Sequence, residues 1–137
     1  LNSKINTNDQ KNIKAVSYSD KLKKEIKDVH DKFKVTNYTK MKSSLKFCVV
    51  AAGEFDLYVA EPRASEWDIA AGDAILTNSG GSITDMDGKK IYYGKKDFKN
   101  PGIILKSARL NNGWTIKNYI NYYSFSFHIW FDNLCNS

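Results

Sequence analysis

The first forty residues of the chain carry apolar positions with two different periods. In KAVSYS, residues 14–19, apolar and polar side chains alternate, which predicts a short strand ending near Ser19. Across residues 20–34 the apolar positions recur every three or four residues, so we expect an amphipathic helix with a lysine-rich outer face, capped by Ser19 or Asp20. Its apolar face would consist of Leu22, Ile26, Val29 and Phe33. Residues 34–39 return to a strand pattern.

The two patterns continue to alternate as far as residue 107. The further elements predicted are a helix from Ser43 or Ser44 to about Gly53, a strand at 55–60, a helix at 67–79, a hairpin of 82–85 with 90–93, and a strand in NPGIILKS. Gly80 and Gly81 suit a left-handed exit from the third helix, and Asp87 with Gly88 suits the hairpin turn. Strands that alternate with helices predict a layered α/β domain with a mixed sheet.

The pattern divides the chain into three parts. Residues 1–14 are polar and show no periodicity, residues 15–107 carry the α/β pattern, and residues 108–137 are rich in aromatic side chains and weakly patterned. The last part is open to two interpretations: a terminal helix or strand, or an appended or out-of-frame tail. A length of 137 residues suits one modest domain or half of a larger one.

Composition and charge narrow the possible functions. The net charge of +6 comes almost wholly from lysines, with only Arg63 and Arg109 as arginines, and the lysines are spread over helix faces and turns. Nucleic-acid readers favour arginine interleaved with aromatic side chains, so we expect no nucleic-acid partner. No apolar run approaches the roughly 20 residues of a membrane helix, and no signal peptide is seen. We therefore expect a cytoplasmic protein, with peripheral contact with the inner membrane left open, and free thiols at Cys48 and Cys135.

The stretch EWDIAAGDAILTNSGG, residues 66–81, is the strongest candidate for chemistry. Asp68 falls in the first turn of the predicted helix, where free N–H groups and the macrodipole favour a carboxylate. That role alone explains an acid here. Trp67 would fix the helix start against the core, however, and the small side chains of residues 70–72 would leave this end open to a ligand. A rigid carboxylate there suits Mg²⁺ bridging to a phosphate.

Several segments together resemble a known family. SSLKFCVVAAGEFDLY, the Trp-Asp-x-Ala-Ala-Gly motif with its Gly-Gly, and Asn-Pro-Gly occur in the order typical of the C-terminal half of the inositol monophosphatase superfamily. The CysQ-type 3'(2'),5'-bisphosphate nucleotidase branch is the most similar. The resemblance covers residues 43–105 and extends less securely back to Ala15. It implies the C-terminal half of the layered αβαβα fold of that superfamily.

The resemblance also implies an activity and its residues. Such enzymes use Mg²⁺ to remove the 3'-phosphate of adenosine 3',5'-bisphosphate, which leaves AMP. Asp68 matches the acid that binds a metal ion and lies against the substrate, and Ser43, Ser44 and Lys46 match the segment that faces the nucleotide phosphate. From the residues alone, the serines could be ordinary helix caps and Lys46 a solvated side chain. Glu61 and Arg63 lie where selectivity residues are expected, and Glu66 need not share a site with Asp68.

This chain departs from the family pattern in ways that affect activity. The family's other metal ligands lie in a Glu-Glu segment and an Asp-Pro-(Leu/Ile)-Asp-Gly-Thr segment, and neither occurs in residues 1–137. One carboxylate cannot hold the family's two or three Mg²⁺ ions. We therefore expect the chain to need the missing N-terminal half and to be inactive alone. The family's phosphate-facing arginine is also absent after Tyr58 unless Arg63 replaces it. An inositol or sugar monophosphatase, or a non-catalytic remnant, are the alternatives.

Overall fold

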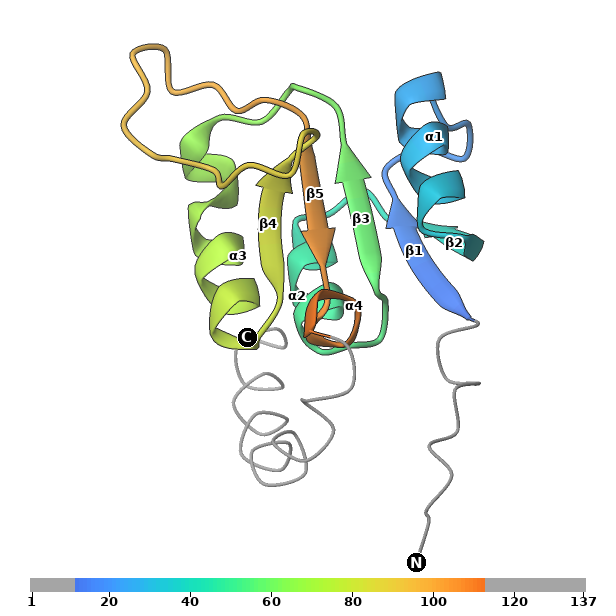
Figure 1. The fold of residues 1–137 in the computed structure, drawn as a ribbon. Coiled ribbons are helices and arrows are strands. Elements are labelled where there is room, and N and C mark those ends of the chain that lie inside the picture. The colour runs from blue at the N-terminus through green and yellow to red at the C-terminus, as the bar shows by residue number, and fades with distance from the viewer. Residues whose placement is uncertain (1–11, 113–137) are drawn as a thin grey trace, which may run out of the picture.

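The strands of the described chain form a single mixed sheet with helices on both faces. The computed structural model describes residues 12–112 (Figure 1). The elements are β1 (Ile13–Ser17), α1 (Lys24–Lys32), β2 (Val35–Lys40), α2 (Leu45–Ala51), β3 (Leu57–Ala60), α3 (Glu66–Asn78), β4 (Ser82–Asp85), β5 (Ile103–Lys106) and α4 (Ala108–Asn112). The predictions for the segments before residue 12 and after residue 112, including Cys135, lie outside the described residues.

The sheet has the strand order β2-β1-β3-β5-β4. β1 runs parallel to both β2 and β3, whereas β5 runs antiparallel to β3 and to β4. β4 therefore points the same way as the three parallel strands, as its arrow shows in Figure 1. The predicted layered α/β domain with a mixed sheet is confirmed.

Alternation within the strands divides the core into two layers. On β3, Tyr58 and Ala60 point into the cluster that packs under α2 and α3, and Leu57 and Val59 point into the opposite cluster. The opposite cluster is covered by Ile26 and Val29 of α1, by Phe33 directly after this helix, and by Leu110 of α4. Because both faces of the strand are covered, all four residues of β3 are buried.

The interface between α2 and α3 explains the small side chain at Gly72. A Cβ atom at this position would lie 2.4 Å from Cγ of Phe47, so glycine lets the two helices approach closely. The interpretation that this residue keeps the helix end open to a ligand is therefore wrong. The prediction that Trp67 fixes the helix start against the core is also wrong, because its side chain is 69% exposed; its ring lies beside that of Phe98, with ring centroids 6.0 Å apart.

The amino ends of the parallel strands are joined by a buried carboxylate that sequence reasoning missed. Asp56 accepts hydrogen bonds from the backbone N–H of Lys14 at 2.9 Å, from Nε of Arg109 at 2.8 Å and from the hydroxyl of Ser107 at 3.3 Å. Its side chain thus ties β1 and α4 to the residue that precedes β3. No motif indicated this role, because the bonded groups are far apart in the sequence.

Two predicted elements differ from the structure. α1 begins at Lys24, with Lys23 as its N-cap and no side-chain cap, so Ser19 and Asp20 do not start the helix. The hairpin of 82–85 with 90–93 forms only next to its turn: one edge of β4 pairs along its length with β5, and the other edge meets the second segment in a bridge between Thr84 and Lys90.

Candidate functional site

The carboxyl ends of the parallel strands lie side by side, and this end of the sheet is called its carboxyl edge. The turn after β2 leads into α2 and the loop after β3 leads into α3, so both helices begin at this edge (Figure 1). The long loop from β4 to β5 lies there too, because β4 ends and β5 begins at the same edge. Ligands of open α/β sheets bind outside the carboxyl ends of the strands. The structure therefore places residues 43–46 and Asp68 on the edge where a ligand site is expected.

Lys46 is a buried cation at this edge. Its side chain belongs to α2, and the residue is only 5% exposed. The ammonium donates hydrogen bonds to the carbonyls of Met41 at 3.1 Å and Ser43 at 2.6 Å, and lies 5.1 Å from the ring centroid of Tyr58. Burial lowers the pKa of Lys46, and the nearby charge of Arg63 lowers it further. The alternative of a solvated lysine is therefore wrong.

The two serines lie on the surface next to this lysine. Both side chains are exposed, and the hydroxyl of Ser43 accepts the backbone N–H of Leu45 at 3.1 Å. Ser44 is the N-cap of α2 by position but makes no side-chain cap bond. Local capping accordingly accounts for the hydroxyl of Ser43. Because Lys46 holds the carbonyl of Ser43, the lysine also orders the turn that presents both hydroxyls.

A second cation lies near Lys46. Arg63, in the loop between β3 and α3, places its guanidinium carbon 3.9 Å from the ring centroid of Tyr18, and the ammonium of Lys46 lies 5.5 Å from the same ring. Neither cation forms an ion pair with a carboxylate within residues 12–112, and Glu61 pairs with Lys23 instead. The charge of Glu61 also acts on Arg63, but two neighbouring cations without a paired carboxylate offer an anion a pair of favourable contacts at this edge.

Asp68 lies in the first turn of α3 and has a local partner. Its carboxylate accepts the backbone N–H of Ser65, the N-cap residue, at 2.8 Å, in a capping box. The side chain is exposed, and no hydrogen bond or ion pair within the described part of the chain joins it to Ser43, Ser44 or Lys46. The helix-start role predicted from sequence is thus confirmed, and it leaves the carboxylate open to solvent.

The donor set of the described residues does not fit a complete Mg²⁺ site. Between residues 12 and 112 no group of three or more His, Cys, Asp or Glu side chains could hold a metal ion. Mg²⁺ requires near-octahedral oxygen ligation and binds protein carboxylates together with water and substrate oxygens. Asp68 could supply one such oxygen and no more.

Glu66 has a structural role that sequence reasoning left undecided. It is buried and accepts the backbone N–H groups of Gly94 at 2.9 Å and Lys95 at 3.0 Å, and the ammonium of Lys95 lies 2.6 Å away. The Lys95 side chain first, and these two N–H groups next, lower the pKa of Glu66 to about 2. The backbone N–H of Glu66 also donates to the carbonyl of Phe98 at 2.8 Å. Residues 94–98 are thereby held against the first turn of α3.

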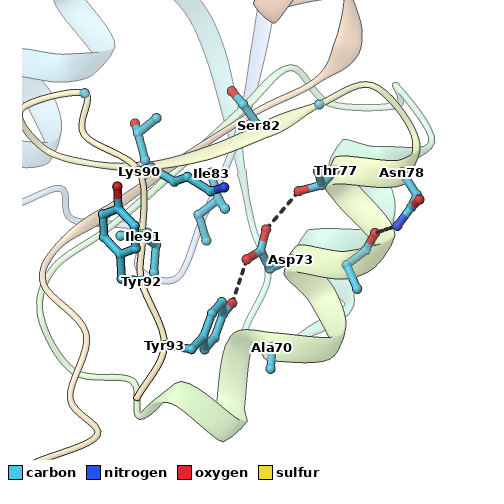
Figure 2. A pocket seen from close by; sticks show the side chains of 14 residues that line it. Ala70, Asp73, Thr77, Asn78, Ser82, Ile83, Lys90, Ile91, Tyr92 and Tyr93 are labelled. Carbon is cyan, nitrogen blue, oxygen red and sulfur yellow. Dashed lines mark hydrogen bonds between the residues drawn. The ribbon is translucent and has the colours of Figure 1, made fainter. Parts of the chain in front are cut away.

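One concavity of the described surface lies away from these residues. It runs between the outer face of α3 and residues 88–93, and none of Ser43, Ser44, Lys46 or Asp68 lines it. Figure 2 shows Asp73 at its centre, where it accepts hydrogen bonds from the Tyr93 hydroxyl at 2.6 Å and the Thr77 hydroxyl at 2.9 Å. Burial, followed by the bond to Asp73, raises the pKa of Tyr93. Both oxygens of the Asp73 carboxylate therefore accept a hydrogen bond from within the protein.

The chain matches the family model described as the inositol monophosphatase family over residues 2–122. It is 45% identical over 65 residues to the 3'(2'),5'-bisphosphate nucleotidase CysQ of Salmonella typhimurium, covering 47% of this chain and 26% of that protein. It is 47% identical over 86 residues to an uncharacterized protein in the pss 5' region of Rhizobium leguminosarum bv. phaseoli, covering 58% of this chain and 87% of that protein.

Among solved structures, CysQ from Bacteroides thetaiotaomicron, a bacterial member of the inositol monophosphatase family, superposes with a TM-score of 0.59 at 32% identity, covering 72% of this chain and 38% of that chain. The chain thus spans well under half of the length of these CysQ proteins. None of the helices described between residues 12 and 112 is long and apolar enough to cross a membrane. The family match, the partial identity to CysQ nucleotidases and the shared fold lead to one conclusion: the chain belongs to the inositol monophosphatase family and is CysQ-like.

Proposed function

We propose that this chain carries the nucleotide-phosphate pocket and one metal ligand of a Mg²⁺-dependent 3'(2'),5'-bisphosphate nucleotidase. The reaction would remove the 3'-phosphate of adenosine 3',5'-bisphosphate and leave AMP. The observation that carries the proposal is the buried ammonium of Lys46 beside the guanidinium of Arg63, without a described carboxylate partner, in a segment related to CysQ nucleotidases.

In this proposal the anion-binding groups come from the turn before α2. A lysine ammonium has three N–H donors, and Lys46 directs two of them to the carbonyls of Met41 and Ser43. The third would contact a phosphate oxygen of the nucleotide. The exposed hydroxyls of Ser43 and Ser44 would donate further hydrogen bonds, which are strengthened by the charge of the phosphate.

Asp68 is proposed as the contribution of this chain to metal binding. Its exposed carboxylate begins α3 at the edge that carries Lys46. Since residues 12–112 offer no further ligand set, the remaining ligands would come from the two acidic segments of an N-terminal half. We accordingly propose that the chain hydrolyses no substrate without that half.

Two alternatives compete with this function. A related phosphatase could act on an inositol or sugar monophosphate, and the relatives include a histidinol-phosphatase of Mycobacterium tuberculosis at 37% identity over 71 residues. The chain could also be a non-catalytic remnant that binds a nucleotide. Comparing the turnover of adenosine 3',5'-bisphosphate, an inositol monophosphate and a sugar monophosphate by one protein tests the first alternative. AMP binding without turnover of any of them identifies the second.

The decisive experiment supplies the proposed N-terminal half from a relative. The part of a CysQ relative that carries both acidic segments is fused ahead of residues 15–137, and phosphate release from adenosine 3',5'-bisphosphate is followed with and without Mg²⁺. We expect Mg²⁺-dependent release, and a loss in the Asp68→Asn variant of at least the roughly 10- to 100-fold that even outer-shell metal partners cause. Glu54→Gln, an exposed carboxylate, is the matched control. Release that is unchanged by Asp68→Asn would reject the metal role.

A further inference from the structure

We propose that Tyr18 is a positioning residue that presents Arg63 as a second phosphate-binding cation beside Lys46. The inference rests on the proposed function, because it takes the same edge of the sheet as the phosphate site. It goes further by assigning the phosphate-facing arginine to a different place in the chain and by naming the side chain that holds it there. The ligand class is the dianionic phosphate group of a nucleoside monophosphate.

The stack between Tyr18 and Arg63 brings together two loops that are far apart in the sequence. Tyr18 directly follows β1, whereas Arg63 belongs to the loop from β3 to α3, and both side chains are exposed. The guanidinium carbon lies 3.9 Å from the ring centroid of Tyr18, which is the distance of close stacking. An exposed arginine otherwise samples many rotamers, and each one fixed on binding weakens affinity. The ring restrains Arg63 before a ligand arrives.

Lys46 lies near the same aromatic ring as the restrained guanidinium. Its ammonium lies 5.5 Å from the same Tyr18 ring, so the two cations lie near one aromatic side chain. Their repulsion is felt at Lys46, whose pKa is lowered by burial and by the charge of Arg63. With no described carboxylate paired to either cation, a phosphate dianion would relieve this repulsion and bind both.

Tyr18 offers Arg63 both its ring and its hydroxyl, since a side-chain hydrogen bond with Arg63 lowers the pKa of Tyr18. The positioning role is assigned to the ring. A phenylalanine would keep the stacking surface, while a leucine would fill a similar volume without the π face. A purely structural role for Tyr18 would instead make its removal harmful whether or not Arg63 is present. The two roles therefore differ in how the effects of Tyr18 and Arg63 combine.

The test measures binding of AMP and of inorganic phosphate to the 137-residue chain at pH 7 by NMR titration. The variants are Tyr18→Phe, Tyr18→Leu, Arg63→Ala, the double variant of Tyr18→Leu with Arg63→Ala, and Lys46→Met. We expect Tyr18→Phe to bind within about twofold of the wild type, and Tyr18→Leu to bind roughly two- to fivefold more weakly. The double variant should bind no more weakly than Arg63→Ala alone, because Tyr18 acts through Arg63.

A second readout reports the stack without any ligand. Ring-current shifts of the Arg63 side-chain protons should persist in Tyr18→Phe and disappear in Tyr18→Leu, with both variants folded by circular dichroism.

A further loss of affinity on adding Tyr18→Leu to Arg63→Ala would overturn the inference. Loss of AMP binding in Lys46→Met, with Tyr18→Leu and Arg63→Ala binding like the wild type, would also overturn it and leave the proposed function standing. A wild-type chain that binds neither AMP nor phosphate would reject the phosphate site itself, and this inference with it.

Discussion

At the scale of single residues, the side chains of this protein often serve two purposes at once. Lys46 orders the serine turn through two carbonyls and still carries its charge to the proposed phosphate site. Asp68 caps its own helix and remains exposed. Glu66, two residues earlier, is buried, and both oxygens of its carboxylate accept hydrogen bonds from the backbone of residues 94 and 95. Adjacent acids on one helix turn thus have different environments, as the helical geometry requires.

The environment of Glu66 predicts a pH dependence of stability. Its pKa falls from 4.5 to about 2 on folding, so its ionised form stabilises the folded state above about pH 4.5, and this contribution is lost as the pH falls toward 2. We expect Glu66→Gln to lower the melting temperature at pH 7 and the gap to the wild type to close between pH 4.5 and pH 2.

Thermal unfolding followed by circular dichroism from pH 2 to pH 7 measures this gap. Glu54→Gln, which changes an exposed carboxylate, is the control and should track the wild type throughout. A gap between Glu66→Gln and the wild type that stays constant over this range would show that the charge of Glu66 contributes nothing.

The resemblance to a family, rather than local pattern, singled out residues 43–46 as candidates for the site, and local pattern did not reveal the contacts around it. The observed order of strand, helix and loop explains why residues 43–46 and Asp68 lie at one edge of the sheet. The bonds of Asp56 and Glu66 join residues from 28 to 53 positions apart, and no local pattern carries that information. The exposure of Trp67 was missed for a related reason, since a large apolar side chain usually lies in the core.

At the scale of elements, the close approach of α2 and α3 is the feature that fixes the layer beneath the site. Gly72 of α3 lies against the Phe47 ring of α2, with no room for a Cβ atom. Both helices begin at the edge that carries Lys46 and Asp68, so their spacing also sets the spacing of those side chains. The pattern of the sequence predicted both helices but not their contact, because a glycine within a helix says nothing of its neighbour.

This contact predicts an unfavourable outcome for Gly72→Ala. Alanine is the better helix former by roughly 0.5–1 kcal/mol, but overpacking a core commonly costs about 1–3 kcal/mol, so we expect net destabilisation. Urea unfolding of Gly72→Ala measures the change. Phe47→Leu in the Gly72→Ala background should recover part of it, because the smaller side chain leaves room for the new methyl group. Stabilisation by Gly72→Ala would contradict the close packing.

At the scale of the whole molecule, the two ends of the parallel strands differ. Hydrogen bonds join the chain at the amino ends, here called the closed edge, whereas the carboxyl ends, here called the open edge, present side chains to solvent. The closed edge is joined by Asp56, which bonds to Lys14, Ser107 and Arg109, and these lie near the two ends of the described segment. The open edge carries the candidate site. One edge thus provides stability, while the other presents side chains to a ligand and to the proposed N-terminal half.

Removing the charge of Asp56 tests the closed edge. Asp56→Asn weakens its ion pair with Arg109, and since the Arg109 side chain is 48% exposed, water compensates part of the loss. We expect a destabilisation of about 1–3 kcal/mol, the range for disrupting buried hydrogen bonds, in urea or thermal unfolding. The exposed Glu54→Gln change should be neutral, and an equally neutral Asp56→Asn would show that the edge is held by packing alone.

The short return of residues 89 and 90 along β4 has a consequence for solubility. β4 is an outermost strand, and such a strand can recruit the same strand of a second molecule and start aggregation. Here the backbone N–H of Asp85 donates to the carbonyl of Lys89, and Thr84 bridges to Lys90, so the end of this strand is occupied by its own chain. The segment that fails to complete a hairpin therefore places two positive charges where a neighbouring molecule would otherwise add its strand.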